Sequence, residues 1–412
     1  MIDRPDICLV TPGHLASTPR VVKNADALAA AGYRVHVVSG RHFPPAEPLD
    51  AAILAQATWR STRTDFPAGW RGLASRVRQK LAQRRIRTSS DCWPLAAQAL
   101  NSGHHTLVAA ASSTRARFFY GHGGVAGLVA AAAAAKLTGG RFGFDAEDWH
   151  EEETDSLQAN PRRLAAIRTP LRALLPQATF LTCAAPLIAQ AYNSAYGVHL
   201  TCLLNVFPLR DAPAAPRLAP SPTSATPAIL YWFSQTIGPG RGLEPLIDVL
   251  KRLRTPTVLH LRGFASPGYC ESLRARAGHL ADRIMVLPPA PPCEMARLAS
   301  SAHLGLSLEQ RTPRNRDLCL TNKIFTYLLA GVPVALTPTS AQRALAPELG
   351  AAALLIDFDA PDRTATHLDN WLINDSPAAA AHAWHLGQDR FNWNHESLKL
   401  LDLCREALGP PK

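Results

Sequence analysis

Four cations stand just before and inside a predicted helix late in the chain. Arg311, Arg314 and Arg316 precede the helix, which we expect over 321–330, and Lys323 falls in its first turn. The first turn of a helix carries roughly half a positive charge, so a cation there costs about 0.3–1 kcal/mol unless an anion binds. Free N–H groups together with added cations form a site for phosphate. Two interpretations stay open: a phosphate site, or a lysine whose ammonium group simply reaches water.

A glycine-rich loop offers a second contact for phosphate. Residues 234–242, with the sequence SQTIGPGRG, follow a short apolar segment that we predict to be a strand at 229–232. The glycines allow a ligand to approach the backbone closely, and Arg241 is placed to meet a phosphate group. Arg262, at the end of the next predicted strand (258–262), is a weaker candidate.

The loop after the first predicted strand is a further candidate for ligand contact. Residues 11–19, with the sequence TPGHLASTP, follow the apolar run 7–10. Ligands of open α/β sheets bind at the carboxyl ends of the strands. Gly13 would let a ligand approach the backbone, and we expect His14 and Arg20 to contact it. The alternative is an ordinary connecting loop.

A short glycine-rich turn after another predicted strand permits two interpretations. Gly121, Gly123 and Ala126 match the G-x-G-x-x-A fingerprint of dinucleotide sites, and Asp145 ends the next predicted strand. This match supports one alternative function, an NAD-dependent oxidoreductase, although the fingerprint usually occupies the first βα turn of a domain. His122 lies between the glycines at the end of the strand, where it is a candidate catalytic residue.

An acidic segment follows that strand. Residues 144–153, with the sequence FDAEDWHEEE, hold six acids and a histidine. Asp148, His150 and Glu151 are candidates to bind the hydroxyl groups of a substrate, and the alternative is a solvated acidic helix start. No set of residues here has the spacing of metal ligands, so we predict no metal site. The D-x-D match at 357–359 is interpreted as chance.

The arrangement of elements predicts an α/β protein of two Rossmann-like domains. A chain of 412 residues exceeds the size of most single cores, and alternating strands and helices imply parallel sheets covered by helices on both faces. Residues 208–227 are rich in Pro, Ala and Ser and are interpreted as a linker between domains 1–207 and 228–390, with 391–412 forming a C-terminal helix that packs back on the first domain. We expect strands at 7–10, 35–39, 118–120, 141–144, 180–183, 202–204, 229–232, 258–262, 284–287, 304–307, 334–337 and 353–356, and helices at 19–31, 125–137, 162–175, 186–196, 243–253, 268–279, 293–302, 321–330, 340–349, 361–374, 376–388 and 394–407.

The net charge indicates which binding partners are favoured, and the cysteines indicate the redox state of the cellular compartment. The net charge of +11 favours anionic partners. The eight cysteines contain no C-x-x-C pair, which argues against a zinc site or a disulfide framework and for a reducing compartment. We see no secretory signal, and the longest uncharged apolar run, 123–135, is too short to span a bilayer.

The predicted phosphate helix carries a family resemblance. Residues 321–337, TNKIFTYLLAGVPVALT, resemble the donor-site helix of the group 1 (family 4) retaining glycosyltransferases. In that family the helix faces the diphosphate and ribose of a sugar nucleotide, which implies a donor role for Asn322 beside the lysine. The two glutamates of the family's E-x7-E motif are replaced here by Leu318 and Thr326, and Glu309 is the nearest upstream carboxylate.

The resemblance extends over nearly the whole chain. Residues 11–39 are similar to the opening of the same enzymes, in which the loop that contains Gly13 lies over the sugar and phosphates. His122 falls on the family's histidine that contacts the transferred sugar, and the acidic segment falls on the acceptor side. The arginine and lysine that clamp the diphosphate correspond to Gln235 and Arg241, so one cation is lost, which Lys323 or Arg316 could replace.

The resemblance implies the GT-B fold, two Rossmann-like domains facing across a cleft. It also implies metal-independent transfer from a nucleotide-diphosphate sugar to a glycan or lipid-linked acceptor, as in bacterial surface polysaccharide or glycoconjugate synthesis. His122 and Glu309 would be the catalytic residues, the nucleotide sugar would be a co-substrate, and we expect no other cofactor and no nucleic acid. Besides the oxidoreductase, a second alternative is a binding protein on a decayed glycosyltransferase scaffold.

The segment 71–87, RGLASRVRQKLAQRRIR, carries seven basic residues and no acid. Leu73, Val77, Leu81 and Ile86 are predicted to line one face of a helix whose other faces are cationic. This composition is typical of a helix that lies in an anionic membrane surface. We therefore expect a cytoplasmic protein that is peripheral on the inner face of the plasma membrane. The alternatives are a solvated surface helix or one that binds nucleic acid.

Overall fold

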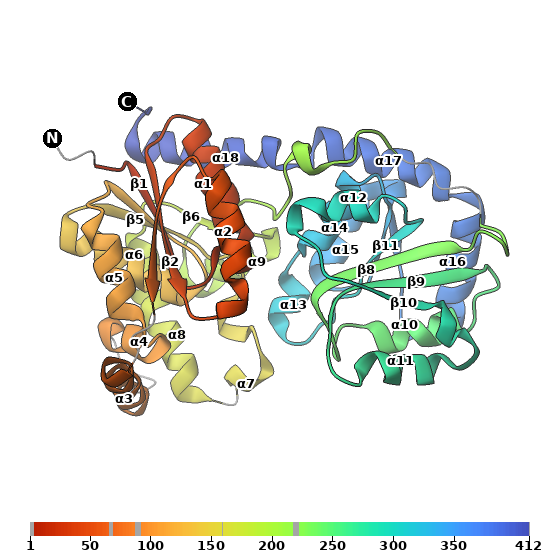
Figure 1. Ribbon diagram of the computed structural model, residues 1–412, viewed down its shortest axis with the longest axis horizontal. Helices are drawn as coiled ribbons and strands as arrows, with labels where there is room; N and C mark the ends of the chain where they lie inside the picture. Colours follow the sequence, from red (N-terminus) through yellow and green to blue (C-terminus); the bar gives the residue numbers. More distant parts are fainter. Residues whose placement is uncertain (1–3, 66–68, 87–91, 159, 217–221, 412) are drawn as a thin grey trace. The chain divides into compact units, whose positions relative to one another are not determined.

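The computed structural model describes residues 4–65, 69–86, 92–158, 160–216 and 222–411 and divides into two compact units (Figure 1). The first unit comprises Met1–Leu203, Pro313–Asn315 and Ser397–Lys412, and the second comprises Leu204–Thr312 and Arg316–Glu396. Each unit is built on a parallel sheet with helices packed around it, which confirms the predicted α/β fold class.

The sheet of the first unit has strand order β3-β2-β1-β4-β5-β6-β7, and all of its pairings are parallel. Its central strands are fully buried, because β1 and β4 pair at the middle of the sheet. The strands are β1 Ile7–Thr11, β2 Val35–Arg41, β3 Arg60–Asp65, β4 Phe118–Gly121, β5 Arg141–Asp145, β6 Leu181–Cys183 and β7 Thr201–Cys202. The helices before the second unit are α1 Pro19–Ala30, α2 Glu47–Gln56, α3 Gly69–Arg85, α4 Trp93–Leu100, α5 His104–Ser113, α6 Val125–Thr138, α7 Asp155–Gln158, α8 Pro161–Leu174 and α9 Pro186–Tyr196.

Helix α6 approaches strand β4 so closely that side chains larger than hydrogen do not fit between them. A Cβ atom on Gly127 would lie 1.8 Å from the carbonyl oxygen of His122. Gly123 and Gly124 make the turn with φ angles of 72° and 79°, a region that favours glycine. The glycines therefore hold His122 at the carboxyl end of β4 against the start of the helix.

The sheet of the second unit has strand order β10-β9-β8-β11-β12-β13, again with parallel pairings. The strands are β8 Ala228–Ile237, β9 Thr257–Ala265, β10 Ile284–Leu287, β11 Leu304–Ser307, β12 Val334–Leu336 and β13 Ala353–Leu355. The helices are α10 Leu243–Leu250, α11 Tyr269–Ala277, α12 Met295–Ala299, α13 Arg314–Leu318, α14 Asn322–Leu329, α15 Ser340–Leu349, α16 Pro361–Asn374, α17 Ser376–Asp389 and α18 Trp393–Leu408.

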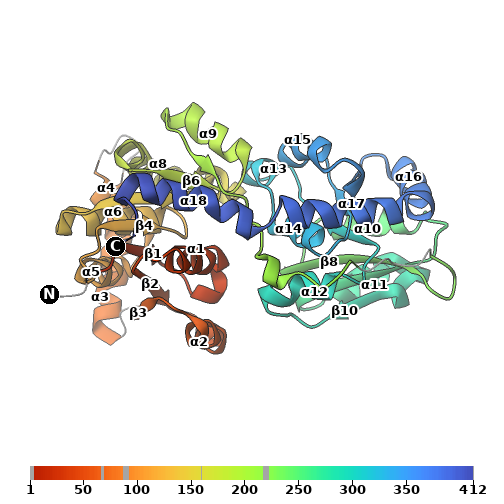
Figure 2. The same cartoon turned by 90° about the horizontal axis from the view of Figure 1, so that it is seen from above.

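The last residues of the chain pack on the first unit (Figure 2). The guanidinium group of Arg117 donates to the carbonyl oxygen of Leu408 over 3.2 Å, and Tyr33 donates to that of Gly409 over 3.0 Å. The boundary between the units falls at Leu203–Leu204, a few residues before the expected linker. Part of that linker, 217–221, lies outside the described residues.

Each predicted strand and helix is present, with ends that differ by a few residues. The sequence did not predict α2, α4, α5, α7, α13 or β3. Strand β3, RSTRTD, contains no apolar residue. It lies at the edge of the sheet and pairs only with β2, so all of its residues keep solvent contact and none has to be apolar. Such a strand has no hydrophobic periodicity for a sequence pattern to reveal.

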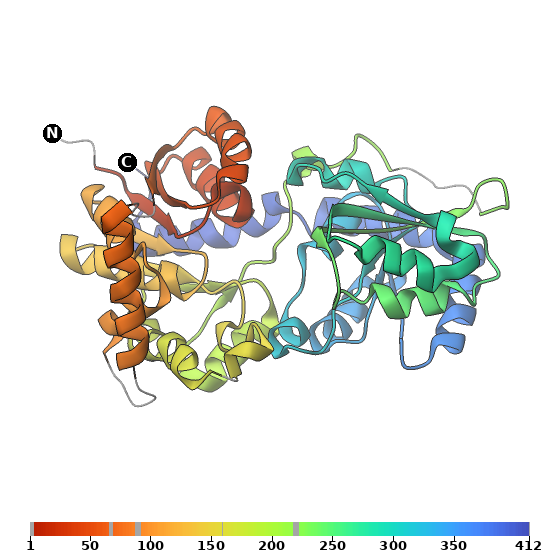
Figure 3. The ribbon, with the colours of Figure 1, turned by 60° about the horizontal axis from the view of Figure 1, so that its bottom comes forward.

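Helix α3 lies on the outside of the first unit, where Figures 1 and 3 show it in orange. Its large apolar side chains at i, i+3 or i+4 spacing are exposed: Trp70 (75%), Leu73 (59%), Val77 (47%) and Leu81 (43%). Ile86, which we predicted to lie on the same face, is instead buried at 1% exposure and packs with Ala82 and Ala96. The prediction for Ile86 is therefore wrong, because the helix turns that residue toward α4.

Within the described residues, none of the helices combines the length and hydrophobicity that crossing a bilayer requires.

Candidate functional site

In the second unit, a buried ion pair stands at the start of α14. Lys323 donates from Nζ to Oε1 of Glu309 over 2.8 Å, and each side chain is only 9% exposed. Burial by itself would raise the pKa of Glu309, but Lys323, with weaker help from Arg316 and Arg241, holds that pKa below its ordinary value. The ionised carboxylate thus supplies the anion that the first turn of α14 lacks in its own sequence. Of the two interpretations, the one in which the ammonium group of Lys323 reaches water is wrong, because the residue is buried.

Two arginines add positive charge around this pair. Arg316, in α13, donates from Nη1 to the carbonyl oxygen of Gly240 over 2.6 Å, which joins α13 to the loop after β8. Arg241, in that loop, is partly exposed and acts electrostatically on Glu309. With Lys323, the donor cluster, as we call this group of four residues, has three cations and one carboxylate. Its net charge of about two positive units suits a diphosphate.

The other predicted donor residues are placed as follows. Thr326 is fully buried, and its hydroxyl group donates to the carbonyl oxygen of Asn322 over 2.9 Å, one turn earlier in α14. Asn322 is partly exposed, and Gln235 is exposed at the end of β8, beside a break in register between Phe233 and Thr236. The roles of these residues toward a donor stay predictions.

Arg262 is held within the second sheet. Its Nε donates to the hydroxyl oxygen of Tyr231 over 2.6 Å, and its Nη1 donates to the carbonyl oxygen of Pro288 over 2.7 Å. The guanidinium carbon also lies 5.9 Å from the centre of the Tyr231 ring. These bonds fix the orientation of Arg262 at the carboxyl end of β9, where a donor contact stays a prediction.

In the first unit, two predicted site residues, Arg20 and His122, meet at Asp145. Arg20, in α1, is 1% exposed and forms a two-pronged ion pair with both carboxylate oxygens of Asp145. Burial by itself would raise the pKa of Asp145, but Arg20 and then His122 hold it far below its ordinary value. Arg20 therefore presents no free face to an acceptor in this structure. Asp145 likewise has no oxygen free for a ribose, which argues against the dinucleotide interpretation.

His122, the other predicted site residue at Asp145, is buried beside that carboxylate. Its Nδ1 lies 3.2 Å from Asp145 Oδ2, and the side chain is 2% exposed. Burial lowers the pKa of His122 more than Asp145 raises it, so the ring is neutral. Nδ1 then donates to Asp145, and Nε2 is an acceptor that has no hydrogen-bond partner among the described residues.

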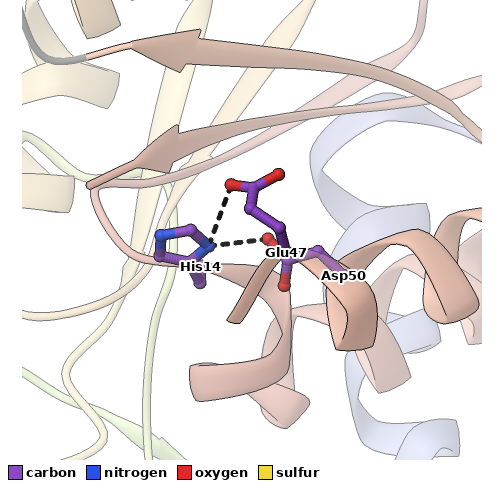
Figure 4. Close-up of side chains that lie close together, drawn as sticks. All are labelled: His14, Glu47 and Asp50. Atoms are coloured by element: carbon purple, nitrogen blue, oxygen red, sulfur yellow. Dashed lines mark hydrogen bonds and ion pairs between the residues drawn. The ribbon is translucent and has the colours of Figure 1, made fainter. Parts of the chain in front are cut away.

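His14 belongs to a network that braces its own loop. Figure 4 shows the ring pointing at Asp50 and Glu47, with Nδ1 2.8 Å from Asp50 and 4.0 Å from Glu47. Its Nε2 accepts hydrogen bonds from the backbone N–H groups of His42 and Phe43, each over 2.9 Å. Both ring nitrogens are thus engaged within the protein. A contact between His14 and an acceptor, or between Gly13 and a donor, stays a prediction.

Within the described residues, His14, Glu47 and Asp50 are also the one group with atoms close enough to hold a metal ion. Arg63 occupies that position, because its guanidinium group lies 2.6 Å from Asp50 and 2.9 Å from Glu47. Asp50 also accepts from the N–H group of Ala16 over 2.8 Å. The carboxylates are therefore already neutralised by an arginine.

A large cavity of about 1010 Å³ lies wholly within the first unit. Its lining comes from α3, the turn between β4 and α6, the acidic segment after β5 and the start of α8. Of the predicted acceptor residues, Asp148 and His150 line it. Glu151 does not, because its carboxylate is bound by Arg168 and by the hydroxyl group of Tyr196.

Glu147 also lines the cavity, and the sequence did not single it out. Its φ angle of 26° is rare for a residue with a side chain and indicates local strain. Burial, followed by the neighbouring Asp148, raises the pKa of Glu147 to about 7. A carboxyl group of that kind exchanges protons near neutral pH. The acidic composition of 144–153 was the one signal in the sequence, and it does not reveal which acid takes the strained position.

The remaining acidic lining is held in place by its neighbours. Burial raises the pKa of Asp148, while Asn315 donates to that carboxylate over 2.9 Å and opposes the rise. Burial would lower the pKa of His150, but Glu153, which is hydrogen-bonded to its Nδ1, raises it above the ordinary value. The Nε2 atom of His150 has no hydrogen-bond partner among the described residues.

No protein-family model matches the chain, and no curated protein matches its sequence. Solved structures do match over almost their whole length. HepE from Anabaena, in complex with UDP and glucose, has a TM-score of 0.66 at 15% identity and covers 97% of this chain and 99% of its own. A sucrose-phosphate synthase from Thermosynechococcus elongatus has a TM-score of 0.67 at 15% identity, with coverages of 98% and 99%. WaaB, a lipopolysaccharide outer core galactosyltransferase, has a TM-score of 0.61 at 13% identity, with coverages of 97% and 99%.

The chain has the GT-B fold. This confirms the fold that the resemblance implied, while the assignment to group 1 (family 4) stays a prediction at these identities. Within the GT-B fold, the donor cluster follows the carboxyl ends of β8 and β11, and His122 follows that of β4. The carboxyl ends of parallel strands are where ligands of doubly wound sheets bind.

Proposed function

We propose that the protein is a glycosyltransferase that takes its sugar from a nucleotide-diphosphate sugar. The observation that carries this proposal is the donor cluster, in which Arg241, Arg316 and Lys323 surround the single carboxylate of Glu309 beside the N-terminus of α14. Cations and helix N–H groups in this arrangement stabilise a leaving diphosphate. The presence of UDP and glucose in the Anabaena HepE structure supports a nucleotide-sugar donor and makes UDP the first nucleotide to test.

The residues of the second unit divide the work on the donor. Arg241 and Arg316 would contact the diphosphate, because both retain exposed surface. Lys323 and Glu309 are buried against each other, so they would act by positioning the first turn of α14 and by setting the local charge. In a retaining transfer without metal, the leaving phosphate oxygen would take the proton of the attacking hydroxyl group on the same face of the sugar.

The first unit would bind the acceptor. The unpartnered Nε2 of His122 can accept a hydrogen bond from a sugar hydroxyl group, and Glu147, Asp148 and His150 line a cavity large enough for a glycan. Titratable groups with shifted pKa values that converge on one cavity are characteristic of functional sites. We infer that this cavity takes a glycan or lipid-linked acceptor, in a pathway such as bacterial surface polysaccharide or glycoconjugate synthesis.

Helix α3 supports a location at a membrane surface. The exposed stripe of Trp70, Leu73, Val77 and Leu81 has cations on both sides of it, from Arg76 to Arg85. An amphipathic helix of this kind inserts its apolar face at the boundary between headgroups and acyl chains while its cations meet anionic lipids. We infer peripheral attachment to the inner face of the plasma membrane, with no role for nucleic acid.

Isothermal titration of the full chain with UDP, GDP and NAD tests the proposal. We expect UDP or GDP to bind and NAD to show no binding. Arg241→Ala should weaken nucleotide binding roughly ten- to a hundredfold, since a charge-assisted contact contributes about 1.5–3 kcal/mol. Arg297→Ala, which removes an exposed cation from α12, is the matched control and should change nothing.

The outcomes of this titration separate the alternatives. Binding of NAD alone would overturn the proposal in favour of an oxidoreductase. Tight binding of UDP by a protein that neither transfers nor hydrolyses the sugar of any UDP-sugar would favour a binding protein on a decayed scaffold. Equal binding of UDP by the parent and Arg241→Ala would show that the donor site lies elsewhere.

A further inference from the structure

The cavity of the first unit has two walls of opposite chemical character. One wall carries Glu147, Asp148, His150 and Glu153, which follow β5. The other carries four cations: Lys80 and Arg84 from α3, and Arg162 and Arg163 from the start of α8. The acidic wall suits the hydroxyl groups of an acceptor sugar, whereas the cationic wall supplies positive charge that a neutral sugar does not require.

The four cations of this wall have no directly bound carboxylate, although the charge of Arg163 acts on Glu153 of the acidic wall. None of their side chains forms an ion pair or hydrogen bond with another described residue, and all four are exposed. Other arginines of the same unit are paired, such as Arg168 with Glu151 and Arg63 with Glu47 and Asp50. Unpaired like charges on one wall repel each other, so the site gains when an anion enters it.

Two further observations at the same cavity point to an anionic ligand. Arg162 and Arg163 stand in the first turn of the 14-residue helix α8, where the helix dipole already disfavours cations unless an anion is bound. His150 lines the cavity at 4% exposure, and its Nε2 has no hydrogen-bond partner among the described residues. A buried polar atom left without a partner indicates that a ligand supplies one.

We propose that the cationic wall binds a phosphate or diphosphate ester carried by the acceptor. The inference rests on the proposed function, because it names the class of acceptor for the same cavity. Lys80 and Arg84 lie four residues apart on the side of α3 that lines the cavity, and the exposed apolar stripe runs along the same helix. A phosphate held by these cations therefore stands beside the stripe, which suits a lipid-linked phosphate whose chain enters the membrane where α3 docks.

The test measures binding of phosphate esters to the full chain while saturating UDP occupies the donor cluster. Geranyl phosphate represents a lipid-linked acceptor and glucose 1-phosphate a soluble one. We expect geranyl phosphate to bind, and the triple variant Arg84→Gln, Arg162→Gln, Arg163→Gln to bind it at least about a hundredfold more weakly, since each charge-assisted contact is worth about tenfold. The matched control, Arg76→Gln, Arg78→Gln, Arg85→Gln, changes the same number of cations but leaves the cavity lining intact.

Each outcome decides between possibilities. If the parent binds neither ester, or if the triple variant binds geranyl phosphate as tightly as the parent, the inference is overturned. Equal binding of both esters, lost in the triple variant, assigns the wall to the phosphate group whatever carries it. Failure of UDP to bind would remove the proposed donor function, whereas the geranyl phosphate titration would still report on the wall. The single variant Arg162→Gln, at an exposed position, covers the case in which the triple variant does not fold.

Discussion

Lys323 in the second unit and Lys80 in the first unit carry the same charge in different surroundings. Lys323 is buried and bound to Glu309 at 2.8 Å, whereas Lys80 is exposed on α3 and forms no ion pair with another described residue. The first arrangement fixes a helix start and sets the charge of a site in advance. The second leaves charge available to whatever binds. The comparison separates paired cations, which stabilise a site within the protein, from unpaired cations, which remain available to bind an anionic ligand. Variants of each kind test the distinction.

The largest effect is expected on the unpaired side, in the attachment of α3 to membranes. Arg76→Glu, Arg78→Glu and Arg85→Glu remove three attractions to anionic lipid and add three repulsions, roughly 6 kcal/mol in total at about 1 kcal/mol per charge. Co-sedimentation with anionic vesicles should show the parent pelleting, release at high salt and no pelleting of the variant.

The matched control for this experiment reverses three exposed cations of the second unit, Arg254→Glu, Arg283→Glu and Arg297→Glu, and has the same net charge. It should pellet nearly as the parent does. Equal losses in the two variants would mean that overall charge, and not α3, drives attachment. Equal partition of the parent into neutral and anionic vesicles would remove the membrane role.

On the paired side, Lys323→Ala should lower the free energy of unfolding by about 3–5 kcal/mol, because it leaves the carboxylate of Glu309 buried without a partner. The double variant Lys323→Met, Glu309→Leu replaces both charges by apolar groups and should lose much less. Urea titration followed by tryptophan fluorescence measures both. Lys80→Ala is the control from the first unit, with an expected change within about 0.5 kcal/mol. If Lys80→Ala lowers the free energy of unfolding as much as Lys323→Ala does, the distinction between paired and unpaired cations is contradicted.

These pairings also mark the limit of what the sequence could predict. The helix at α14 and the loop after β8 follow from local patterns, so the sequence placed Lys323 in the first turn of α14 and Arg241 in that loop, but it did not predict α13, which holds Arg316. It could not show that Glu309, fourteen residues before Lys323, neutralises it. His14 and Asp50, thirty-six residues apart, meet for the same reason. Contacts of this kind are set by the order of strands in the sheet, which no local periodicity encodes.

The candidate site in the first unit shows the same limit more strongly. The glycines around His122 predicted a close turn, and the structure has one. The cavity, however, requires α3, the β4–α6 turn and α8 to converge, and these elements are spread over about a hundred residues. The strained backbone of Glu147 is likewise fixed by its surroundings, so the six acids of 144–153 looked alike in sequence.

A smaller effect is expected from the pH dependence of stability at Glu147. The pKa of this carboxyl group is raised to about 7 by burial and then by Asp148, against about 4.3 for an unfolded glutamate. Between about pH 4.3 and about pH 7, the carboxyl group of Glu147 therefore keeps its proton in the folded chain and releases it in the unfolded chain. The contribution to stability is therefore complete below about pH 4.3 and is lost as the pH rises to about 7, by at most about 1.4 kcal/mol per pH unit.

Glu147→Gln should flatten this part of the curve of unfolding free energy against pH. Glu271→Gln, at an exposed position in α11, is the control and should leave the slope as it is. An unchanged slope in Glu147→Gln would show that another group of the acidic wall carries the proton. This result would exclude Glu147 as the titrating group and would leave the inference about the cationic wall unchanged.

The smallest effect, none at all, is expected when divalent metal is removed. The three cations of the donor cluster exceed its one carboxylate by two charges, which match the charge that a leaving diphosphate develops. UDP should therefore bind the full chain with the same affinity in excess EDTA and in magnesium.

The acidic wall of the first unit is the opposite case, since Glu147, Asp148 and Glu153 are oxygen ligands of the kind that hard cations prefer. If EDTA abolishes UDP binding and magnesium restores it, the built-in cations of the second unit are not sufficient. Repeating the titration with Arg241→Ala then distinguishes a site that uses its own cations from a site that uses bound metal. A site that depends on its own cations loses UDP in this variant whether or not magnesium is present.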